Sequence, residues 1–522
     1  MDKGESKMII PAYKDLKIKE NQENASSRVL FVEKADIGTL EFYMAFFENS
    51  GCDKKEERTE AGHSFIAYKN GNDGIFLNYF DTVSELYIVE EKDTLYFSQS
   101  VGESEQKVTP QITQVKLEDY GMSYAIRLPD GRFIIIDGGR EFLPDAERLY
   151  NCLKEGSTDE KPAVACWIMT HPHSDHFHCF IPFMDNYGDN IEIESFMLNF
   201  PERDDTVHYP KLTAMDPRFE DSSPFTNIPK MYERIEKSGG KVYTSHTGQI
   251  YRFGECELEI LSSMDDTIHV SNNINAISTF IRMKLGGQVI LWAADSHFSA
   301  TKLSEKYGAY LKADILQVPH HGFQGGTAES EINGYRLIRP EVAFLPVSDF
   351  NAFTAFCAHK PSARYLMEYL EIGELITGET QRTVDLPYRA EKDGKSRLKK
   401  KLQRGISNCG AECFVFTGLK TDKTSDFEFS FLNMTHSKAT VFAELFFEDY
   451  KQNIRAIKLE VGPLRMIKTS IVGEDVDPDA LYFNWMSLKE KGIPENAIFA
   501  VRFISDIPII ITHSEHKEAY RS

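Results

Sequence analysis

The segment that most constrains this chain reads AVACWIMTHPHSDH and spans residues 163–176. Its first half is apolar without polar alternation, which is the pattern of a β-strand covered on both faces. Its second half places four metal-binding or acid–base side chains directly after that strand: His171, His173, Asp175 and His176. Since a buried strand has no structural need for so many titratable groups at its end, the pattern indicates a site with chemistry.

The spacing of these four residues is typical of a metal site. Residues two apart in an extended segment face the same side, so His171 and His173 are expected to direct two imidazoles at one ion. Asp175 and His176 lie at a turn into a predicted helix and are expected to face a second ion. Imidazole and carboxylate ligands together suit zinc, with manganese or iron as alternatives.

A polar loop with accidental histidines is the competing interpretation. With 15 histidines in 522 residues, such a pattern should arise by composition on the order of once per thousand chains of this kind. The metal site is therefore the favoured interpretation. His178, two residues further on, has no such support and is expected only to pack or to hydrogen-bond.

The distribution of predicted strands and helices divides the chain into three domains. Residues 1–104 are expected to form a small α+β accessory domain with no readable chemistry of its own. Residues 105–390 alternate strands and helices, as an α/β domain with helix-covered sheets does. Residues 391–522 are strand-rich and are expected to form a β-rich accessory domain.

The charge and hydropathy of the chain exclude some partners. A net charge of −21 and a pI near 5.3 oppose binding of long nucleic acid, but they allow a small anionic substrate at a local cationic or metal site. No apolar stretch is long enough to span a bilayer and no secretory signal opens the chain, so a cytoplasmic protein without a membrane partner is expected. The oligomeric state cannot be read from these features.

Several motifs resemble one known family in the same order. HPHSDH matches the HxHxDH box of the metallo-β-lactamase superfamily, and FIIIDGG and VILWAAD resemble two of its strands that end in aspartate. ADILQVPHHG, NNINAIST (272–279) and AHKP (358–361) resemble one branch, which includes the hydrolase domain of the DNA-internalisation (competence) protein and the phosphorylcholine esterases. The resemblance covers roughly residues 105–390.

The resemblance implies a metallo-β-lactamase-like αββα sandwich and a role for further residues. Asp137 would support the ligand loop, and Asp295 would bridge two ions. His320 is the expected later metal ligand. His321 is expected either to hydrogen-bond to a ligand or to donate to a substrate oxygen or leaving group, and Asp175 would orient the nucleophile. Further candidates are His269 or Asn275 for the remaining ligand of the first metal, and His359 for the pocket wall. The chain departs from the family at Ala293-Ala294, where Thr-Gly usually precedes the aspartate.

The function that follows is a di-metal hydrolase whose two divalent cations share a hydroxide at neutral pH. Branch resemblance favours a phosphodiesterase acting on a small or terminal phosphodiester. Hydrolysis of a carboxylic ester, thioester or lactam by the same site is the alternative within enzymes. A different class of hypothesis is a catalytically degenerate binding or regulatory protein. The presence of His171, His173, Asp175, His176 and Asp295 argues against it, whereas the open position of the remaining ligand argues slightly for it.

Overall fold

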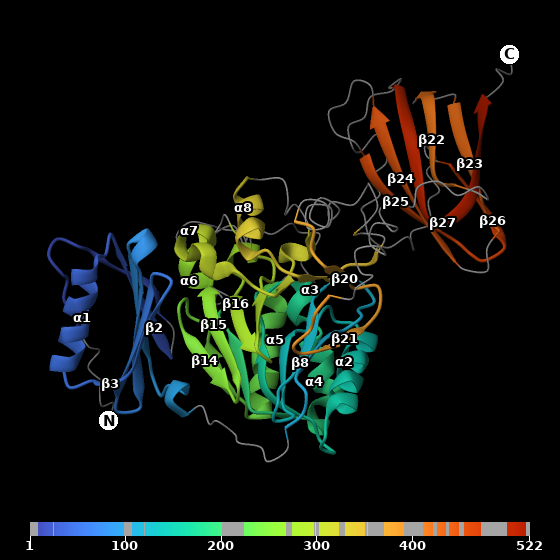
Figure 1. Ribbon diagram of the computed structural model, residues 1–522. Helices are drawn as coiled ribbons and strands as arrows, with labels where there is room; N and C mark the ends of the chain where they lie inside the picture. Colours follow the sequence, from blue (N-terminus) through green and yellow to red (C-terminus); the bar gives the residue numbers. More distant parts are fainter. Residues whose placement is uncertain are drawn as a thin grey trace. The chain divides into compact units, whose positions relative to one another are not determined.

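The computed structural model describes residues 9–23, 26–98, 107–119, 121–200, 224–267, 274–296, 298, 302–322, 329–349, 352, 370–390, 411–420, 425–434, 438–447, 454–470 and 498–517. The chain divides into two compact units (Figure 1). Unit 1 comprises residues 1–352 and 361–395, and unit 2 comprises residues 353–360 and 396–522. The predicted division of unit 1 at residue 104 stays a prediction.

Unit 1 begins with an antiparallel sheet that carries one helix. The strand order is β1 (Ile18–Glu23), β2 (Ser27–Glu33), β6 (Glu85–Glu91), β5 (Asp73–Phe80), β4 (His63–Asn70) and β3 (Asp53–Glu60). Helix α1 (Ile37–Asn49) starts where the Asp36 carboxylate accepts a hydrogen bond of 2.7 Å from the Thr39 amide, which supplies a missing partner at the helix N-terminus. Leu40, Tyr43 and Phe47 of α1 pack on this sheet.

Two larger sheets follow and hold the candidate site. The first sheet has the order β13 (Lys241–Thr244), β12 (Ser195–Leu198), β10 (Ala163–Ile168), β9 (Phe133–Asp137), β8 (Ser123–Arg127), β7 (Gln111–Gln114) and β21 (Arg382–Asp385), with β11 (Glu192–Ile193) beside β10. The second sheet has the order β14 (Ile250–Phe253), β15 (Cys256–Ser262), β16 (Phe280–Leu285), β17 (Gln288–Trp292), β18 (Ile315–Gln317), β19 (Val342–Leu345) and β20 (Glu374–Thr377).

The main core lies between these two sheets. Tyr124 of the first sheet reaches across to the second, with its ring centroid 4.8 Å from that of Trp292 and 5.7 Å from that of Phe344. Ile126 and Ile136 belong to the same buried cluster. Side chains of the two inner faces therefore interdigitate, as in other sheet-on-sheet packings.

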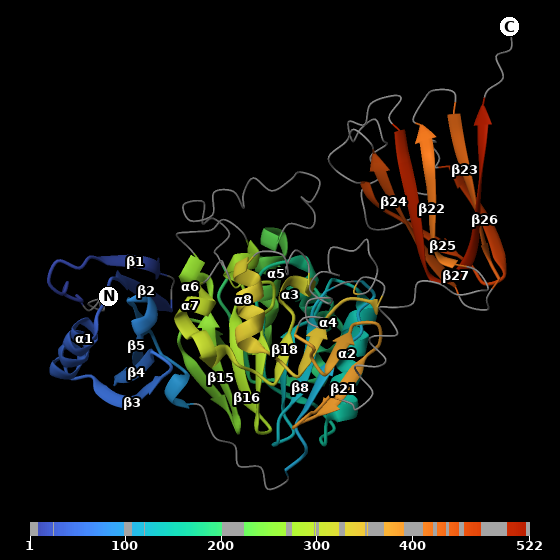
Figure 2. The same ribbon diagram turned by 45° about the horizontal axis from the view of Figure 1, so that its top comes forward.

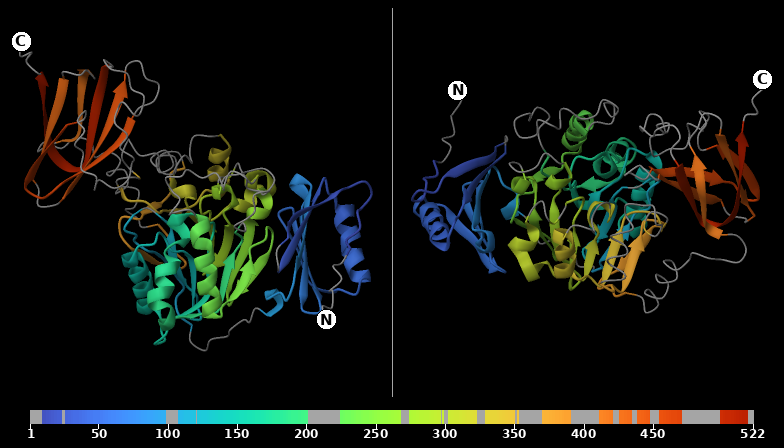
Figure 3. Two further views of the ribbon diagram at one scale, coloured as in Figure 1. Left: turned by 180° about the vertical axis from the view of Figure 1, so that it is seen from behind. Right: turned by 90° about the horizontal axis from the view of Figure 1, so that it is seen from above.

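Helices cover the other faces of the sandwich. On the outer face of the first sheet, the Trp167 ring lies 4.9 Å from Phe180 and 4.9 Å from Phe183 of α4 (Phe180–Tyr187). Helices α2 (Leu143–Gly156) and α5 (Pro224–Ser238) share this layer (Figure 3). Helices α7 (Leu303–Tyr307) and α8 (Glu329–Ile338) lie beside the second sheet (Figure 2). The predicted mixed α/β, sheet-rich class is confirmed, whereas the arrangement of flanking domains stays a prediction.

Unit 2 is built from strands β22 (Ala411–Lys420), β23 (Ser425–Asn433), β24 (Ala439–Phe447), β25 (Ile454–Val461), β26 (Arg465–Ser470) and β27 (Ile498–Lys517). β27 pairs with β22 and β24 through its first part and with β23 through its second part. One strand thus joins both groups of strands around a core that includes Phe429, Phe431 and Phe503.

The structure departs from the sequence pattern at three elements. The sequence TLYFSQ (94–99) favours a strand, but Tyr96–Ser98 form a 3₁₀ turn. The sequences AIFAVRFIS (497–505) and IPIIITHS (507–514) indicate two strands, whereas β27 is continuous. Strand β3 was not predicted, because its sequence DKKEERTE has no apolar alternation. None of the helices in the described segments is long and apolar enough to cross a membrane.

Candidate metal centre

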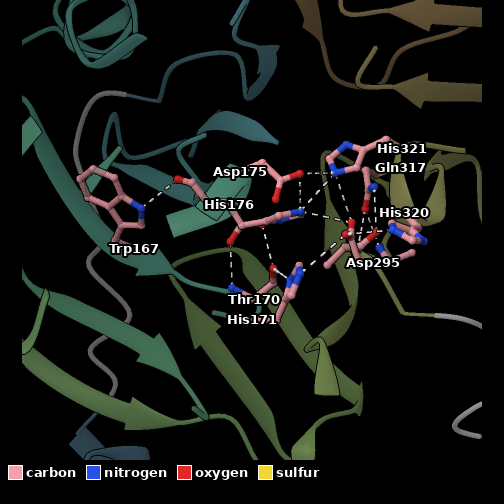
Figure 4. A network of polar contacts seen from close by, with 12 residues as sticks. Trp167, Thr170, His171, Asp175, His176, Asp295, Gln317, His320 and His321 are labelled. Carbon is pink, nitrogen blue, oxygen red and sulfur yellow. Dashed lines mark hydrogen bonds and ion pairs between the residues drawn. The ribbon is translucent and has the colours of Figure 1, made fainter. Parts of the chain in front are cut away.

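The predicted site residues come from four strand ends. Asp137 ends β9, and residues 170–176 follow β10, which runs parallel to β9. Asp295 follows β17, and His320 and His321 follow β18, which runs parallel to β17. Since carboxyl ends of parallel strands meet at one edge of a sheet, the four segments converge at the same edge of the sandwich (Figure 4).

Two groups of potential ligand atoms form there. The His171 group consists of His171, His173 and Asp295, and the Asp175 group consists of Asp175, His176 and His321. Within each group the ligand atoms lie within 4.8 Å of one another. All these side chains are buried except that of His173, which is half-buried.

Asp295 faces both groups with different oxygens. Its Oδ2 lies 3.6 Å from Nε2 of His171. Its Oδ1 lies 3.2 Å from Nε2 of His176 and 3.5 Å from Nε2 of His321. A carboxylate placed in this way can offer one oxygen to each of two neighbouring cations.

Asp137 fixes the ring of His176. The Asp137 carboxylate accepts hydrogen bonds of 2.8 Å from both the amide and the hydroxyl of Thr170, and its Oδ2 lies 2.7 Å from Nδ1 of His176. With Nδ1–H directed at Asp137, the lone pair of Nε2 points into the Asp175 group. Trp167 donates a further bond of 2.9 Å to the Asp137 carbonyl.

His320 and His321 lie differently with respect to the two groups. His321, the predicted substrate donor, belongs to the Asp175 group, with Nε2 3.1 Å from Asp175 Oδ2 and 3.2 Å from His176 Nε2. His320, the predicted ligand, has Nε2 3.8 Å from Asp295 Oδ2 and 3.1 Å from Nδ2 of Asn275. Its side chain is 19% exposed, against 3% for His321. This placement favours exchanging the two predicted roles.

The remaining candidates divide into three cases. Asn275 contacts the centre through His320, and its role as the remaining ligand of the first metal stays a prediction. His178 is buried 3.0 Å from Glu141 and also stands outside both groups, in line with the expectation that it only hydrogen-bonds. His269 and His359 lie outside the described residues.

The protonation preferences of the centre follow from burial and neighbouring charge. Burial lowers the pKa of His171 and of His173, which keeps both imidazoles neutral and able to bind a cation. Burial also acts to lower the pKa of His176, but Asp295, Asp137 and Asp175 outweigh it and raise that pKa well above the usual value. Burial raises the pKa of Asp295, yet His176 and His321 more than offset it, so the net direction is downward.

These residues fit divalent cations. The buried Nε2 of His171 has no hydrogen-bond partner among the described residues, and a buried polar atom without a partner is costly unless something binds it. Imidazole nitrogens and carboxylate oxygens are also the donor set that zinc, manganese and iron accept. The clustered carboxylates favour positive charge, so they raise the pKa of His176 and would also attract a cation.

Sequence reasoning missed two residues that organise the centre. Thr170 bridges Asp137 and the first ligand histidine, since its hydroxyl also lies 3.2 Å from Nδ1 of His171. Gln317 accepts hydrogen bonds from the two amides that precede Asp295, and it ends the strand that leads to His320. Thr170 could have been found from its place directly before the histidine box, but nothing in the sequence around Gln317 distinguishes it from an ordinary strand residue.

No protein-family model and no curated protein matches the chain. Among solved structures, the flavodiiron protein from Giardia intestinalis is 13% identical, with a TM-score of 0.22, over 55% of this chain and 53% of that one. A beta-lactamase domain protein from Burkholderia ambifaria is 8% identical, with a TM-score of 0.22, over 67% and 77%. The Anabaena sensory rhodopsin transducer is 18% identical, with a TM-score of 0.16, over 21% and 92%. Scores this low carry no argument about the chain, so its chemistry must be argued from its own residues.

Proposed function

We propose that this chain is a metal-dependent hydrolase of the metallo-β-lactamase type that holds two divalent cations, zinc in the first instance. The observation that carries the proposal is the Asp295 carboxylate, whose two oxygens face the His171 group and the Asp175 group separately. The order of the sequence motifs supports the same family. A hydrolase with two metals needs a ligand that can bind both ions, and a carboxylate with one oxygen toward each group can do so.

Each group would hold one cation. His171 and His173 would bind the first and Asp175, His176 and His321 the second, with Asp295 shared. Bound cations would lower the pKa of water and polarise an oxygen of the substrate. Asp137 keeps His176 in the tautomer that presents Nε2 to the centre.

His320 is proposed to act on the substrate rather than as a ligand. It is the more exposed of the two adjacent histidines and lies on the side of the His171 group, where Asn275 holds its ring. An imidazole in that place can donate a hydrogen bond to a phosphoryl oxygen or a proton to a leaving group. We therefore propose a small anionic phosphodiester as the substrate and the cytoplasm as the place of action.

Two alternatives lead to different measurements. The same centre could act on a carboxylic ester, thioester or lactam, because an activated water can attack a carbonyl carbon as well as a phosphorus atom. A degenerate binding protein would keep the fold and lose the metals. The presence of both ligand groups supports an enzyme over this second alternative.

The test combines metal analysis with a substrate panel. The parent, purified without chelator, should contain close to two transition-metal ions per chain and hydrolyse a chromogenic phosphodiester faster than a phosphomonoester, a thioester or a lactam. Asp295→Asn should lose metal and nearly all turnover, because asparagine keeps the shape but loses the negative charge and one oxygen donor. Asp145→Asn is the matched control, since the Asp145 carboxylate is buried on α2 and accepts a bond of 2.8 Å from the Glu118 amide.

The outcomes separate the hypotheses. A parent that contains no metal and takes up none on addition would rule out the hydrolase. Metal binding with turnover only of a thioester or a lactam would keep the enzyme and reject the phosphodiester. Full metal and near-parent turnover in Asp295→Asn would mean that the bridging role belongs to another residue.

A further inference from the structure

Gln317 is a fully buried glutamine at the end of β18 that the proposed chemistry does not use. Its side chain leaves the strand next to the turn that carries Asp295 (Figure 4). Oε1 accepts hydrogen bonds from two successive backbone amides, 2.8 Å from Ala293 and 2.7 Å from Ala294. Nε2 donates to the carbonyls of Val318 at 2.6 Å and Ala294 at 3.3 Å.

The turn that Gln317 contacts and the turn that follows its own strand are both conformationally unfavourable. Ala294 has φ +47°, and His320 and His321 have φ +48° and +50°. A left-handed backbone costs a residue with a Cβ roughly 1–2 kcal/mol. Such conformations persist only where surrounding contacts determine them.

The contacts of Gln317 are of the kind that determine these turns. One primary amide satisfies both N–H groups that lead into Asp295 and two carbonyls on the strand and turn around it. The Ala294 carbonyl also accepts a bond of 2.8 Å from the His320 amide, so the two turns are linked directly as well. Gln317 itself belongs to neither ligand group.

We propose that Gln317 is a positioning residue that sets the distance between Asp295 and the His320–His321 turn, and thereby the affinity of the centre for its cations. This inference rests on the proposed function, because it assumes that Asp295 and His321 bind metal. A glutamine that merely stabilised the fold would affect the free energy of unfolding without changing metal affinity. The two roles therefore differ in a measurable way.

The experiment titrates Zn²⁺ and Co²⁺ into metal-free parent, Gln317→Leu and Gln317→Glu. Leucine fills the space but removes all four hydrogen bonds, so we expect metal affinity to fall about 10–100-fold, the usual loss when support of a metal ligand is removed. Glutamate keeps the acceptor for both amides and loses the donors, so it should recover part of that affinity. The visible absorption of bound Co²⁺ should change in Gln317→Leu, because it reports the ligand arrangement.

Gln114→Leu is the matched control. Gln114 is also a buried glutamine with partners at both ends, since it accepts a bond of 2.8 Å from the Tyr124 hydroxyl and donates one of 2.8 Å to the Thr377 carbonyl. This control should lower the melting temperature and leave metal affinity unchanged.

Each result decides between the claims. Equal metal affinity and equal Co²⁺ spectra in parent, Gln317→Leu and Gln317→Glu would overturn the positioning role while leaving the hydrolase intact. A parent that binds neither metal would overturn the proposed function and this inference together. If Gln317→Leu fails to fold, Gln317→Glu decides: affinity and spectrum equal to the parent's would reject the role, and weakened affinity would support it.

Discussion

Two buried clusters of ionisable side chains in the described part of unit 1 differ in the residue type that balances their carboxylates. The Lys306 cluster consists of Lys306, Asp266, Glu85 and Tyr87. The Lys306 side chain is 1% exposed, forms an ion pair with Asp266 and another of 3.2 Å with Glu85, and donates to the Tyr87 hydroxyl at 3.3 Å. The candidate metal centre instead gathers histidines around Asp175 and Asp295, whose ion pairs in the described residues include no lysine or arginine.

The difference teaches how to tell a structural cluster from a site. Buried carboxylates need a counter-charge, because an unpaired charge in the interior is costly. In the Lys306 cluster the lysine side chain provides the counter-charge, and the polar atoms bond to one another. In the metal centre the acceptors converge on shared positions, and the His171 Nε2 has no hydrogen-bond partner among the described residues.

Removal of the buried lysine charge should have the largest effect on stability. Lys306→Met leaves Asp266 and Glu85 buried without their common partner, so we expect a loss of about 3–5 kcal/mol in the free energy of unfolding. Metal content of the folded protein should stay at the parent value. Urea denaturation and elemental analysis measure the two quantities.

Lys302→Met is the control for that experiment. Lys302 pairs with the same Glu85 at 3.2 Å, but its side chain is 57% exposed. An exposed ion pair contributes about 0–1 kcal/mol, so this variant should stay close to the parent. Equal losses in both variants would show that burial of Lys306 does not matter, and loss of metal in Lys306→Met would show that the two clusters are not independent.

A smaller, pH-dependent effect is expected at His246, next to the Lys306 cluster. His246 is fully buried, with Nδ1 3.1 Å from Asp265 and Nε2 3.1 Å from the Ser27 hydroxyl. Burial lowers its pKa, but Asp265, with a smaller contribution from Glu91, raises the net value above 6.5.

A raised histidine pKa means that the folded state binds the proton more tightly than the unfolded chain does. The stabilisation is therefore complete below pH 6.5, the usual histidine value, and is lost as the pH rises through the folded pKa. His246→Gln should be less stable than the parent at pH 6, with a difference that narrows toward alkaline pH. Urea denaturation across pH 6–9 measures this, and a difference that grows with pH would reverse the assigned sign.

The smallest effect concerns strain at the metal centre. Ala294 has φ +47°, so Ala294→Gly should raise the free energy of unfolding by about 1 kcal/mol. Ala293 is not in the left-handed region, and Ala293→Gly should lower stability by about 0.5–1 kcal/mol through the extra freedom of the unfolded chain. Thermal unfolding of the two variants makes the comparison, and a loss of stability in Ala294→Gly would show that no strain is stored there.

The sequence could indicate that His171, His173, Asp175 and His176 lie together, because the four residues form one local segment. The spacing of His171, His173, Asp175 and His176 along the chain already brings their side chains together. The apolar strand before them sets where they lie in the fold. The roles of His320 and His321 could not be predicted in the same way. Both residues have left-handed backbone, so neither strand alternation nor helical periodicity says which ring turns inward.

Other features depend on contacts that no local pattern encodes. Gln317 is recognisable only once β17 and β18 lie side by side, because its partners are backbone amides of the neighbouring strand end. The continuity of β27 is another such feature, because it runs through Asp506 and Pro508, and proline is ordinarily kept out of the middle of a sheet. In the structure they lie where its pairing passes from β22 and β24 to β23.

The late position of β27 in the sequence also affects the order in which strands can pair during synthesis. β22 ends at Lys420, and its only partner among the described strands is β27, which begins at Ile498. A ribosome adds roughly 5–20 residues per second, so β22 waits several seconds for its partner, whereas the sheet of β1–β6 is complete once Glu91 has emerged. A nascent chain stopped between residues 470 and 498 would carry the pairs β23–β26 and β24–β25 beside an unpaired β22, with no strand to join them.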